Sequence, residues 1–364
     1  MLQIHHPFHG AILNHRHGRQ TADRLTIEVW GTAPLGAAVT VNGIPARRNG
    51  EHFLAAVPLM RFENDIRAVA AGFQGSAEHT VKVVWDKYSC KRFRFSIDDN
   101  IFFLRNLAQE KPKSLFDNLY LRQLKKLYDE FGVKFTLNLF YRTPEDDFNL
   151  SQMPADWLPQ FADNSDWLRM TWHAKAEFPD RPYQYAGAAQ IEADCELIRR
   201  EICRFAGEAA WCPPTIVHWG ELQPSALPAL RRCGVTALSG YFQLQDLRYA
   251  VSYGLDEARC AYLNCHDALM DFDSGIVFTR NDIVFNNTPL EQVEPTLRPL
   301  LDDADNGEYM DLLTHEQYFW PFYQAYVPDH AERIAAGLRL LTDHGYTAIW
   351  QHEGFLGVER LPES

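Results

Sequence analysis

The distribution of hydrophobic positions divides the chain into two parts with different periods. Within the first 85 or so residues apolar and polar positions alternate, as at Leu25, Ile27 and Val29, which Thr26 and Glu28 separate. Further short apolar runs cover residues 38–41, 53–57, 65–70 and 80–85, with Gly, Asn or Pro between them. A period of two with no helical pattern between the runs predicts strands. We therefore predict a small all-β sandwich domain over residues 1–88.

In the rest of the chain, helical periods alternate with apolar runs. Leu121, Leu124 and Tyr128 mark one face of a predicted helix that ends at Gly132, and a predicted strand follows at 133–140. The same order returns at Gly207, Gly234 and Gly345, which precede predicted strands at 215–218, 235–238 and 347–350. Repeated helices and strands predict an α/β domain whose parallel strands are joined by right-handed crossovers. A (β/α) barrel over residues 89–364 is the simplest such architecture, with long loops over residues 243–287.

Charge and composition restrict the possible partners. The chain carries 35 Lys and Arg against 48 Asp and Glu, a net charge of −13, which argues against nucleic acid or an anionic membrane as a partner. No apolar stretch approaches the roughly 20 residues of a membrane span, and the N-terminal residues show no export signal. We therefore expect a cytoplasmic protein whose seven cysteines, none in a CxxC pair, are reduced thiols. Nothing in the sequence predicts the oligomeric state.

Polar residues with catalytic chemistry follow several of the predicted strands. Asp98 and Asp99 end the strand 93–97, and His173 ends the strand 167–172. Glu177, His218, His315 and Glu316 occupy similar places at or just after strand ends. The carboxyl ends of parallel strands meet at one face of an α/β domain, so we expect these side chains to converge there.

These residue types point to a metal centre with an acid–base partner. Two adjacent carboxylates in a dry site require a nearby cation, so Asp99 is a candidate ligand while Asp98 remains free as a base. His173 and Glu177, four residues apart, can face one ion from a single helical turn, and His218 is an alternative third ligand. Imidazole and carboxylate ligands suit Zn²⁺ best, with Mn²⁺, Co²⁺ or Fe²⁺ as alternatives.

Over residues 91–356 the chain resembles the polysaccharide deacetylase superfamily, the NodB-homology group that includes carbohydrate esterase family 4. The family motif TFDD corresponds here to Ser96-Ile97-Asp98-Asp99. The resemblance implies that Asp98 is the general base and Asp99 a metal ligand. The family motif HxxxH, which supplies two ligands, corresponds to the segment from His173 to Glu177, so the second ligand is altered or comes from elsewhere.

Two further motifs extend the resemblance. An Arg-Pro-Pro motif stands here as Cys212-Pro213-Pro214, which lacks the arginine that orients the base in the family. The last motif, an apolar strand ending in the general acid His, matches residues 310–315, so the resemblance implies that His315 is the acid. The leading domain looks like the immunoglobulin-like sandwiches often attached to carbohydrate-active enzymes.

The resemblance implies a metal-dependent hydrolase that removes an N- or O-acetyl group from a carbohydrate or amino sugar. Residues flanking the strand ends are candidates for substrate binding: Trp172, Trp219, Glu316 and Tyr318. The ordinary alternative for the aromatic residues is barrel core. Two other functions fit parts of the pattern. One is a glycoside hydrolase that uses Asp98 and Glu177. The other is a catalytically degenerate protein that binds glycan or assists polysaccharide biosynthesis.

Overall fold

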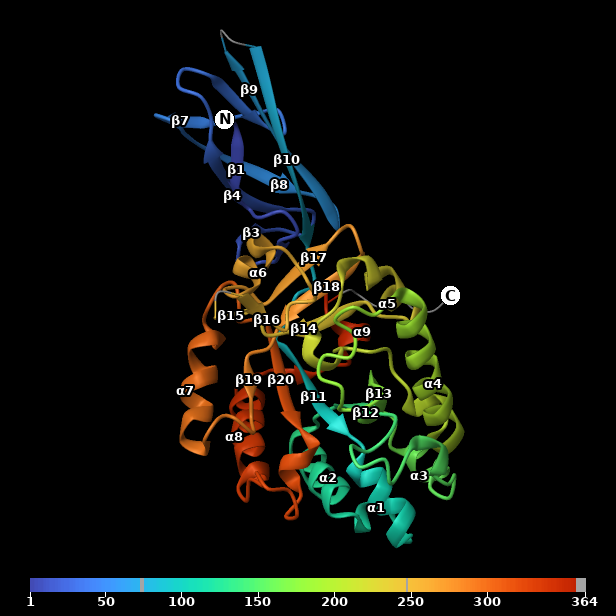
Figure 1. Cartoon of the computed structure of the whole chain (residues 1–364). Coiled ribbons are helices and arrows are strands. Elements are labelled where there is room, and N and C mark those ends of the chain that lie inside the picture. Colours follow the sequence, from blue (N-terminus) through green and yellow to red (C-terminus); the bar gives the residue numbers. More distant parts are fainter. Residues whose placement is uncertain (73–74, 247, 358–364) are drawn as a thin grey trace. The chain divides into compact units, whose positions relative to one another are not determined.

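The structure is a computed structural model that describes residues 1–72, 75–246 and 248–357 (Figure 1). The chain divides into two compact units. The first contains Met1–Cys90, Ala268–Asp273 and the described part of the C-terminal segment that begins at Leu356. The second contains Lys91–Asp267 and Ser274–Phe355. No helix in the described residues combines the length and apolar character that a membrane crossing requires.

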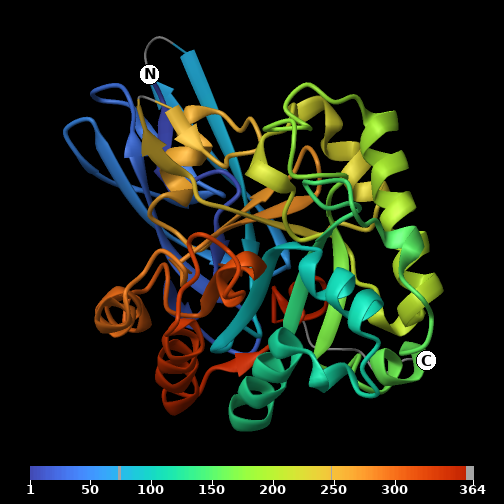
Figure 2. The same cartoon turned by 60° about the horizontal axis from the view of Figure 1, so that its bottom comes forward.

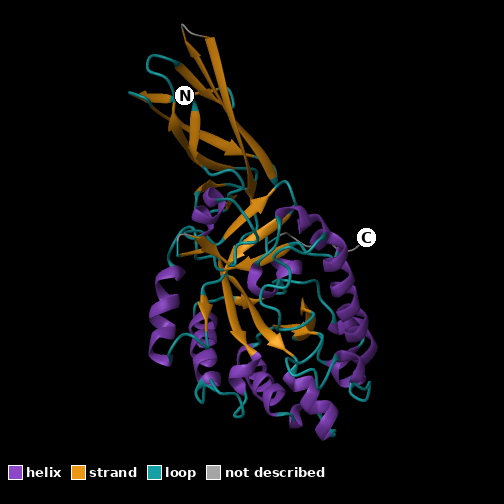
Figure 3. Cartoon of the chain, viewed as in Figure 1, coloured by secondary structure: helices purple, strands orange, loops and turns teal. Residues whose placement is uncertain are grey.

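The first unit is built from strands (Figure 3). One sheet has the order β1-β4-β8-β7 with β3 beside β4, and the other has the order β2-β10-β9-β5-β6. The strands are β1 (Gln3–His6), β2 (Ile12–Leu13), β3 (Gly18–Gln20), β4 (Leu25–Thr32), β5 (Ala38–Val41), β6 (Ile44–Pro45), β7 (Arg47–Asn49), β8 (His52–Leu59), β9 (Glu63–Gly72), β10 (Gly75–Trp85) and β17 (Ala268–Asp271). Leu25, Ile27 and Val29 of β4 are buried and contribute to the unit's core, as the alternating pattern predicts.

The second unit is a mixed α/β structure. Its main sheet has the order β13-β12-β11-β20-β19, and every ladder along it is parallel. These strands are β11 (Arg92–Asn100), β12 (Phe135–Phe140), β13 (Leu168–Ala174), β19 (Ile283–Val284) and β20 (Tyr309–His315), and β21 (Thr347–Ala348) pairs with the start of β11. β14 (Ala237–Gly240) pairs in parallel with β18 (Ile276–Arg280) in a separate sheet. The ladders described therefore form an open main sheet with β13 and β19 at its edges.

Helices lie around these strands (Figures 1 and 2). They are α1 (Phe102–Glu110), α2 (Leu119–Phe131), α3 (Leu158–Asp163), α4 (Ala188–Ala206), α5 (Leu227–Arg232), α6 (Glu257–Leu263), α7 (Leu290–Leu301), α8 (His330–Asp343) and α9 (Gln351–Gly354). The predicted helix before Gly132 is α2, and Gly132 ends it in the left-handed conformation, with φ of 65°. The Asn118 side chain caps its start by accepting hydrogen bonds from two backbone N–H groups.

Two predictions of local structure are wrong. Residues 215–218 do not form a strand; the chain there is irregular, and a short 3₁₀ turn begins at His218. Residues 243–287 are not simply long loops, because they include α6, β18 and the hairpin of β15 (Gln243–Gln245) and β16 (Arg248–Ala250). Residues 215–218 and β18 take partners from other parts of the chain, Ser239 and β14 respectively, which local periodicity does not report.

Candidate metal centre

A bulge in β11 brings Asp98 and Asp99 to the same side of the sheet. In the ladder with β12, Ile97 pairs with Leu137 and Asn100 pairs with Leu139, so β11 contains one extra residue. Successive side chains of a regular strand point to opposite faces, but a bulge re-aims them. Asp99 has a φ of 60°, a left-handed conformation that a β-strand interior does not normally contain. Both carboxylates approach His173 as a result.

The two histidines also lie at irregular points of the backbone. On β13, Trp172 pairs with Leu139 and Ala174 pairs with Phe140, so His173 is the extra residue of a second bulge. His218 begins a 3₁₀ turn in which Trp219 has a φ of 64°. Each candidate ligand is thus presented by a local departure from regular structure, which is common beside functional sites.

Three buried ligand atoms form a small triangle. The distance from Asp99 Oδ1 to His173 Nε2 is 3.2 Å, and that from Asp99 Oδ1 to His218 Nδ1 is 3.4 Å. His173 Nε2 and His218 Nδ1 are 3.1 Å apart. Tetrahedral ligands bound at roughly 2.0–2.1 Å from one ion are themselves roughly 3.3 Å apart. The triangle therefore has the dimensions of one face of a zinc-type coordination shell.

The hydrogen bonds around the triangle fit a bound cation. Asp99 Oδ1 is buried without a hydrogen-bond partner among the described residues, which is costly for a carboxylate oxygen unless a cation compensates. The other oxygen, Asp99 Oδ2, accepts a hydrogen bond of 3.0 Å from Gln317 Nε2. His173 Nδ1 faces the Ile216 carbonyl oxygen at 3.4 Å, so we place its proton there and its Nε2 lone pair toward the triangle.

The electrostatics of Asp99 and His218 suit metal ligation. Burial alone would raise the pKa of Asp99, but the neighbouring imidazoles of His173, His315 and His218 hold it well below its ordinary value. Burial, together with the charge of the neighbouring His173, lowers the pKa of His218 to about 3. Burial would also lower the pKa of His173, but Asp98 and Asp99 outweigh this effect and raise it. An ionised Asp99 and a neutral His218 are the protonation states that a metal requires.

Asp98 lies beside the triangle and keeps one oxygen directed toward it. Its Oδ1 accepts hydrogen bonds from Ser96 Oγ at 2.9 Å and from Asn138 Nδ2 at 2.6 Å. Its Oδ2 is 3.9 Å from His173 Nε2. This is the arrangement of a base held in place by one oxygen, with the other available.

His315 lies at the end of β20, directly opposite Asp98 in the parallel ladder. Its Nδ1 donates a hydrogen bond of 2.9 Å to Asn286 Oδ1. The Asn286 amide is oriented in turn by its donation to Asn287 Oδ1 at 2.8 Å. Because Nδ1 makes this hydrogen bond, Nε2 is the nitrogen of His315 that can exchange a proton with a substrate. The His315 side chain is only half-buried.

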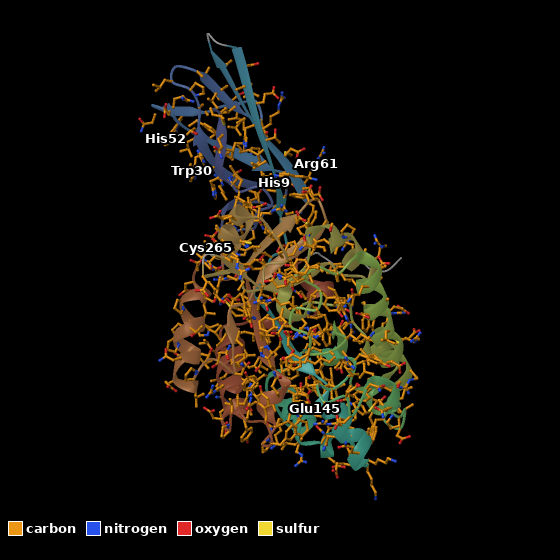
Figure 4. All side chains as sticks on the ribbon, in the orientation of Figure 1. His9, Trp30, His52, Arg61, Glu145 and Cys265 are labelled. Atoms are coloured by element: carbon orange, nitrogen blue, oxygen red, sulfur yellow. The ribbon has the colours of Figure 1, made fainter. Side chains whose placement is uncertain are left out.

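A cavity of about 460 Å³ opens beside Asp99. Its wall includes Glu177, Gln317 and aromatic side chains from α1, β12 and two loops: Phe102, Phe140, Phe178, Phe322 and Tyr323. Glu145, labelled in Figure 4, belongs to the same wall. The cavity is large enough for a sugar-sized ligand next to the metal centre.

Glu177 lies outside the triangle, on the cavity wall. The predicted pairing with His173 required a helix, but His173 lies in β13 and the chain around Glu177 is irregular. Burial raises the pKa of Glu177 to about 7, and the charge of Asp99 acts in the same direction. Of the two alternatives for the third ligand, the structure therefore favours His218.

Two of the four predicted substrate-binding residues are buried and support the fold instead. Trp172 is fully buried and packs edge-on against Tyr183. Glu316 is also fully buried and caps α1, accepting hydrogen bonds from the N–H groups of residues 101, 102 and 103 at 2.7, 2.9 and 2.6 Å. Neither side chain is available to substrate in this structure.

The other two predicted substrate residues are accessible. Trp219 is 43% exposed next to His218, and the Arg181 guanidinium lies over its ring at 5.3 Å. Tyr318 is half-buried, and its ring centroid is 6.2 Å from that of His315. Both flank residues of the site.

The cap on α1 leads to a prediction about stability. Replacing Glu316 by glutamine should destabilise the fold by about 1–3 kcal/mol, because an amide NH₂ would face N–H donors that a carboxylate now satisfies. The matched control is Glu332→Gln, an exposed position in the first turn of α8, which should change stability by less than about 0.5 kcal/mol. Urea unfolding measures both. Equal stability of the two variants would contradict the capping role.

Several residues around the site were not predicted. Asn138 has a signal in retrospect, because it is a polar residue within the apolar strand 133–140. Ser96 lies inside the motif that carries Asp98, but its type alone indicates no role. Asn286 and Gln317 lie outside the strands, and no local sequence pattern indicates their roles. Their partners, His315 and Asp99, come from β20 and β11.

Comparisons with known proteins give limited information. No protein-family model matches the chain, and no curated protein matches its sequence. Among solved structures, the Bc1960 peptidoglycan N-acetylglucosamine deacetylase aligns over 72% of this chain and 86% of its own, with 8% identity and a TM-score of 0.36. A proposed alpha-galactosidase/melibiase from Bacteroides fragilis aligns over 65% of this chain and 56% of its own, with 11% identity and a TM-score of 0.20. Because both scores are low, the function proposed below rests on the site itself.

Proposed function

We propose that the protein is a metal-dependent hydrolase of the polysaccharide deacetylase type, which removes an N- or O-acetyl group from a carbohydrate. The observation that carries this proposal is the triangle of Asp99, His173 and His218, with Asp98 beside it and His315 paired with Asp98 across the ladder of β11 and β20. Three metal ligands, a carboxylate base and an imidazole acid are the groups that hydrolysis of an amide or ester requires.

The residues of this chain divide the chemistry between them. A divalent ion held by Asp99, His173 and His218 would acidify a water molecule and polarise the acetyl carbonyl group. Asp98 accepts the proton of the attacking water at Oδ2, while Ser96 and Asn138 hold its Oδ1. His315 donates a proton from Nε2 to the departing amine or alkoxide. Zn²⁺ suits the ligand set best, and Mn²⁺, Co²⁺ and Fe²⁺ are the alternatives.

The proposal extends to the architecture and the substrate. Parallel strands with a site at their carboxyl ends fit a distorted (β/α) barrel of the NodB type over residues 89–364. The two sheets of the first unit fit an immunoglobulin-like sandwich over residues 1–88. The aromatic wall of the cavity fits a sugar ring or an amino sugar. Tyr318 lies beside the wall residue Tyr323, with their ring centroids 5.5 Å apart, and Trp219 contacts the candidate ligand His218.

Metal content and acetate release test the proposed function. The full chain, purified without a histidine tag, should bind about one transition-metal ion and release acetate from acetylated amino sugars. Chelation should abolish that release and added Zn²⁺, Mn²⁺ or Co²⁺ should restore it. A glycoside hydrolase would instead cleave glycosidic bonds and keep its activity after chelation. Failure to bind any of the three metals would contradict the proposal.

The role of His315 makes a prediction about leaving groups. His315→Ala should slow cleavage of an acetamide by about 10²–10⁴-fold, because an amine leaves only when protonated. Cleavage of an activated acetyl ester, whose leaving group needs no proton, should be slowed far less. The measurement is kcat/KM for the two substrates with wild type and variant. Equal losses on both substrates would argue against the acid role.

A further inference from the structure

Asp98 is held by two neutral hydrogen-bond donors that are themselves buried. Asn138 Nδ2 donates to Asp98 Oδ1 at 2.6 Å and lies 2.7 Å from Ser96 Oγ. Ser96 Oγ donates to the same Asp98 oxygen at 2.9 Å. Ser96 and Asn138 are fully buried, and Asp98 is nearly so. Hydrogen bonds to a buried carboxylate are among the stronger ones in proteins, so this contact constrains the Asp98 side chain.

No arginine or lysine takes this role among the described residues. Arg94, on the same face of β11, is committed to Asp311, to which its Nε donates at 2.8 Å. Cys212 occupies the place of an arginine in the motif, but its buried thiol faces the Met170 carbonyl oxygen at 3.7 Å. The orientation of Asp98 therefore depends on an amide and a hydroxyl.

Asn138 also supports the bulge that presents the two aspartates. Its Nδ2 lies 3.4 Å from the carbonyl oxygen of Ile97, the last residue before the bulge. Asn100, on the other side of the bulge, donates to the Ile97 carbonyl at 2.6 Å and lies 3.3 Å from the Asn138 carbonyl. The Asn138 side chain of β12 thus contacts both the bulge and the Asp98 carboxylate that the bulge presents.

We infer that Asn138 is the positioning residue for Asp98. Together with Ser96, it fixes Asp98 Oδ1, so that Oδ2 faces the metal centre and receives the proton of the attacking water. This inference rests on the proposed function. It assigns the orientation of Asp98 to a neutral amide rather than to a cationic side chain. Asn138 contacts none of the three candidate ligands in the contacts described.

Kinetics of the metal-loaded full chain test the inference. Asn138→Ala should lower kcat by about 10–100-fold, the usual effect of losing one hydrogen bond to a charged group, while KM and metal content stay within about twofold. Ser96→Ala, a smaller change that preserves the strand, should lower kcat in the same way but less. Thr171→Val is the matched control, since Thr171 is buried on β13 and its hydroxyl has no partner in the described part of the chain. It should leave kcat unchanged.

A double-mutant cycle separates positioning from a general structural effect. If Asn138 acts through Asp98, adding Asn138→Ala to Asp98→Asn should cause no further loss of kcat. Multiplicative losses, or a loss of bound metal in Asn138→Ala, would overturn the inference. Should Asn138→Ala fail to fold, the same cycle with Asn138→Ser, which also lacks the Nδ2 donor, decides the question.

An independent readout separates this inference from the proposed function. If the metal-loaded wild type hydrolyses no acetylated substrate, the proposed function fails while the Asn138 contact remains testable by NMR. A short bond to a carboxylate moves the side-chain amide proton of Asn138 downfield, and Asp98→Ala should move it back upfield. Thr171→Val should leave it in place. An Asn138 signal that does not respond to Asp98→Ala would overturn the inference.

Discussion

Replacement of Asp99 by alanine should lower the affinity for the metal by more than about 100-fold and abolish hydrolysis with it. Asp99 supplies the one anionic ligand of the triangle, at 3.2 and 3.4 Å from the two imidazole nitrogens. Loss of an outer-shell partner alone typically costs 10–100-fold in metal affinity, so loss of a direct ligand should cost more. Elemental analysis of protein equilibrated with limiting Zn²⁺ measures the stoichiometry, and calorimetric titration measures the affinity.

Thermal unfolding provides a second measure of the same change. Metal that binds only the folded state stabilises it, so Zn²⁺ should raise the Tm of the wild type. The Asp99→Ala variant should show little or no increase. A full complement of bound metal in Asp99→Ala would show that the triangle is not the metal site.

Glu177→Gln is the matched control and also decides between two ligand sets. Glu177 lies on the wall of the cavity next to Asp99 but outside the triangle. It should therefore retain the metal stoichiometry and the Zn²⁺-dependent increase in Tm. If Glu177→Gln lost the metal and His218→Ala kept it, the ligand set that includes Glu177 would replace the one seen here.

The candidate ligands were predictable because they follow from a rule that acts on whole strands. Polar residues that end apolar strands of a parallel α/β domain meet at one face, whatever the details of packing. The structure brings Asp99 of β11 and His173 of β13 together in this way. His218 joins them from a 3₁₀ turn that follows an irregular segment, so the strand predicted before it does not explain its position. Glu177 was selected by a different rule, helical spacing, which fails because no helix forms there.

The remaining features depend on geometry that a linear pattern does not contain. The bulges at Asp99 and His173 arise from the register of three strands against one another. Those bulges decide which neighbouring side chains face the site and which, like Trp172, face the core. Glu316 was misassigned for a related reason, since its partners are N–H groups of α1 more than 200 residues earlier in the chain.

Replacement of Asp98 by asparagine should leave the metal in place and lower kcat by about 10³–10⁴-fold. The two side chains have the same shape, and the new amide oxygen can still accept hydrogen bonds from Ser96 and Asn138. An amide cannot take up the proton of the attacking water, however, so the contribution of general base catalysis is lost.

The combination of unchanged metal and lost turnover distinguishes Asp98 from Asp99. Asp98 contributes no atom to the triangle, since its Oδ2 is 3.9 Å from His173 Nε2. Metal content, Tm and KM should therefore match those of the wild type, while kcat alone falls. If Asp98→Asn also lost the metal, Asp98 would be a ligand, and the base would have to be another group of the cavity. If the variant kept full activity with metal bound, no carboxylate at this position would be needed as a base, and the proposed division of roles between the two adjacent aspartates would be incorrect.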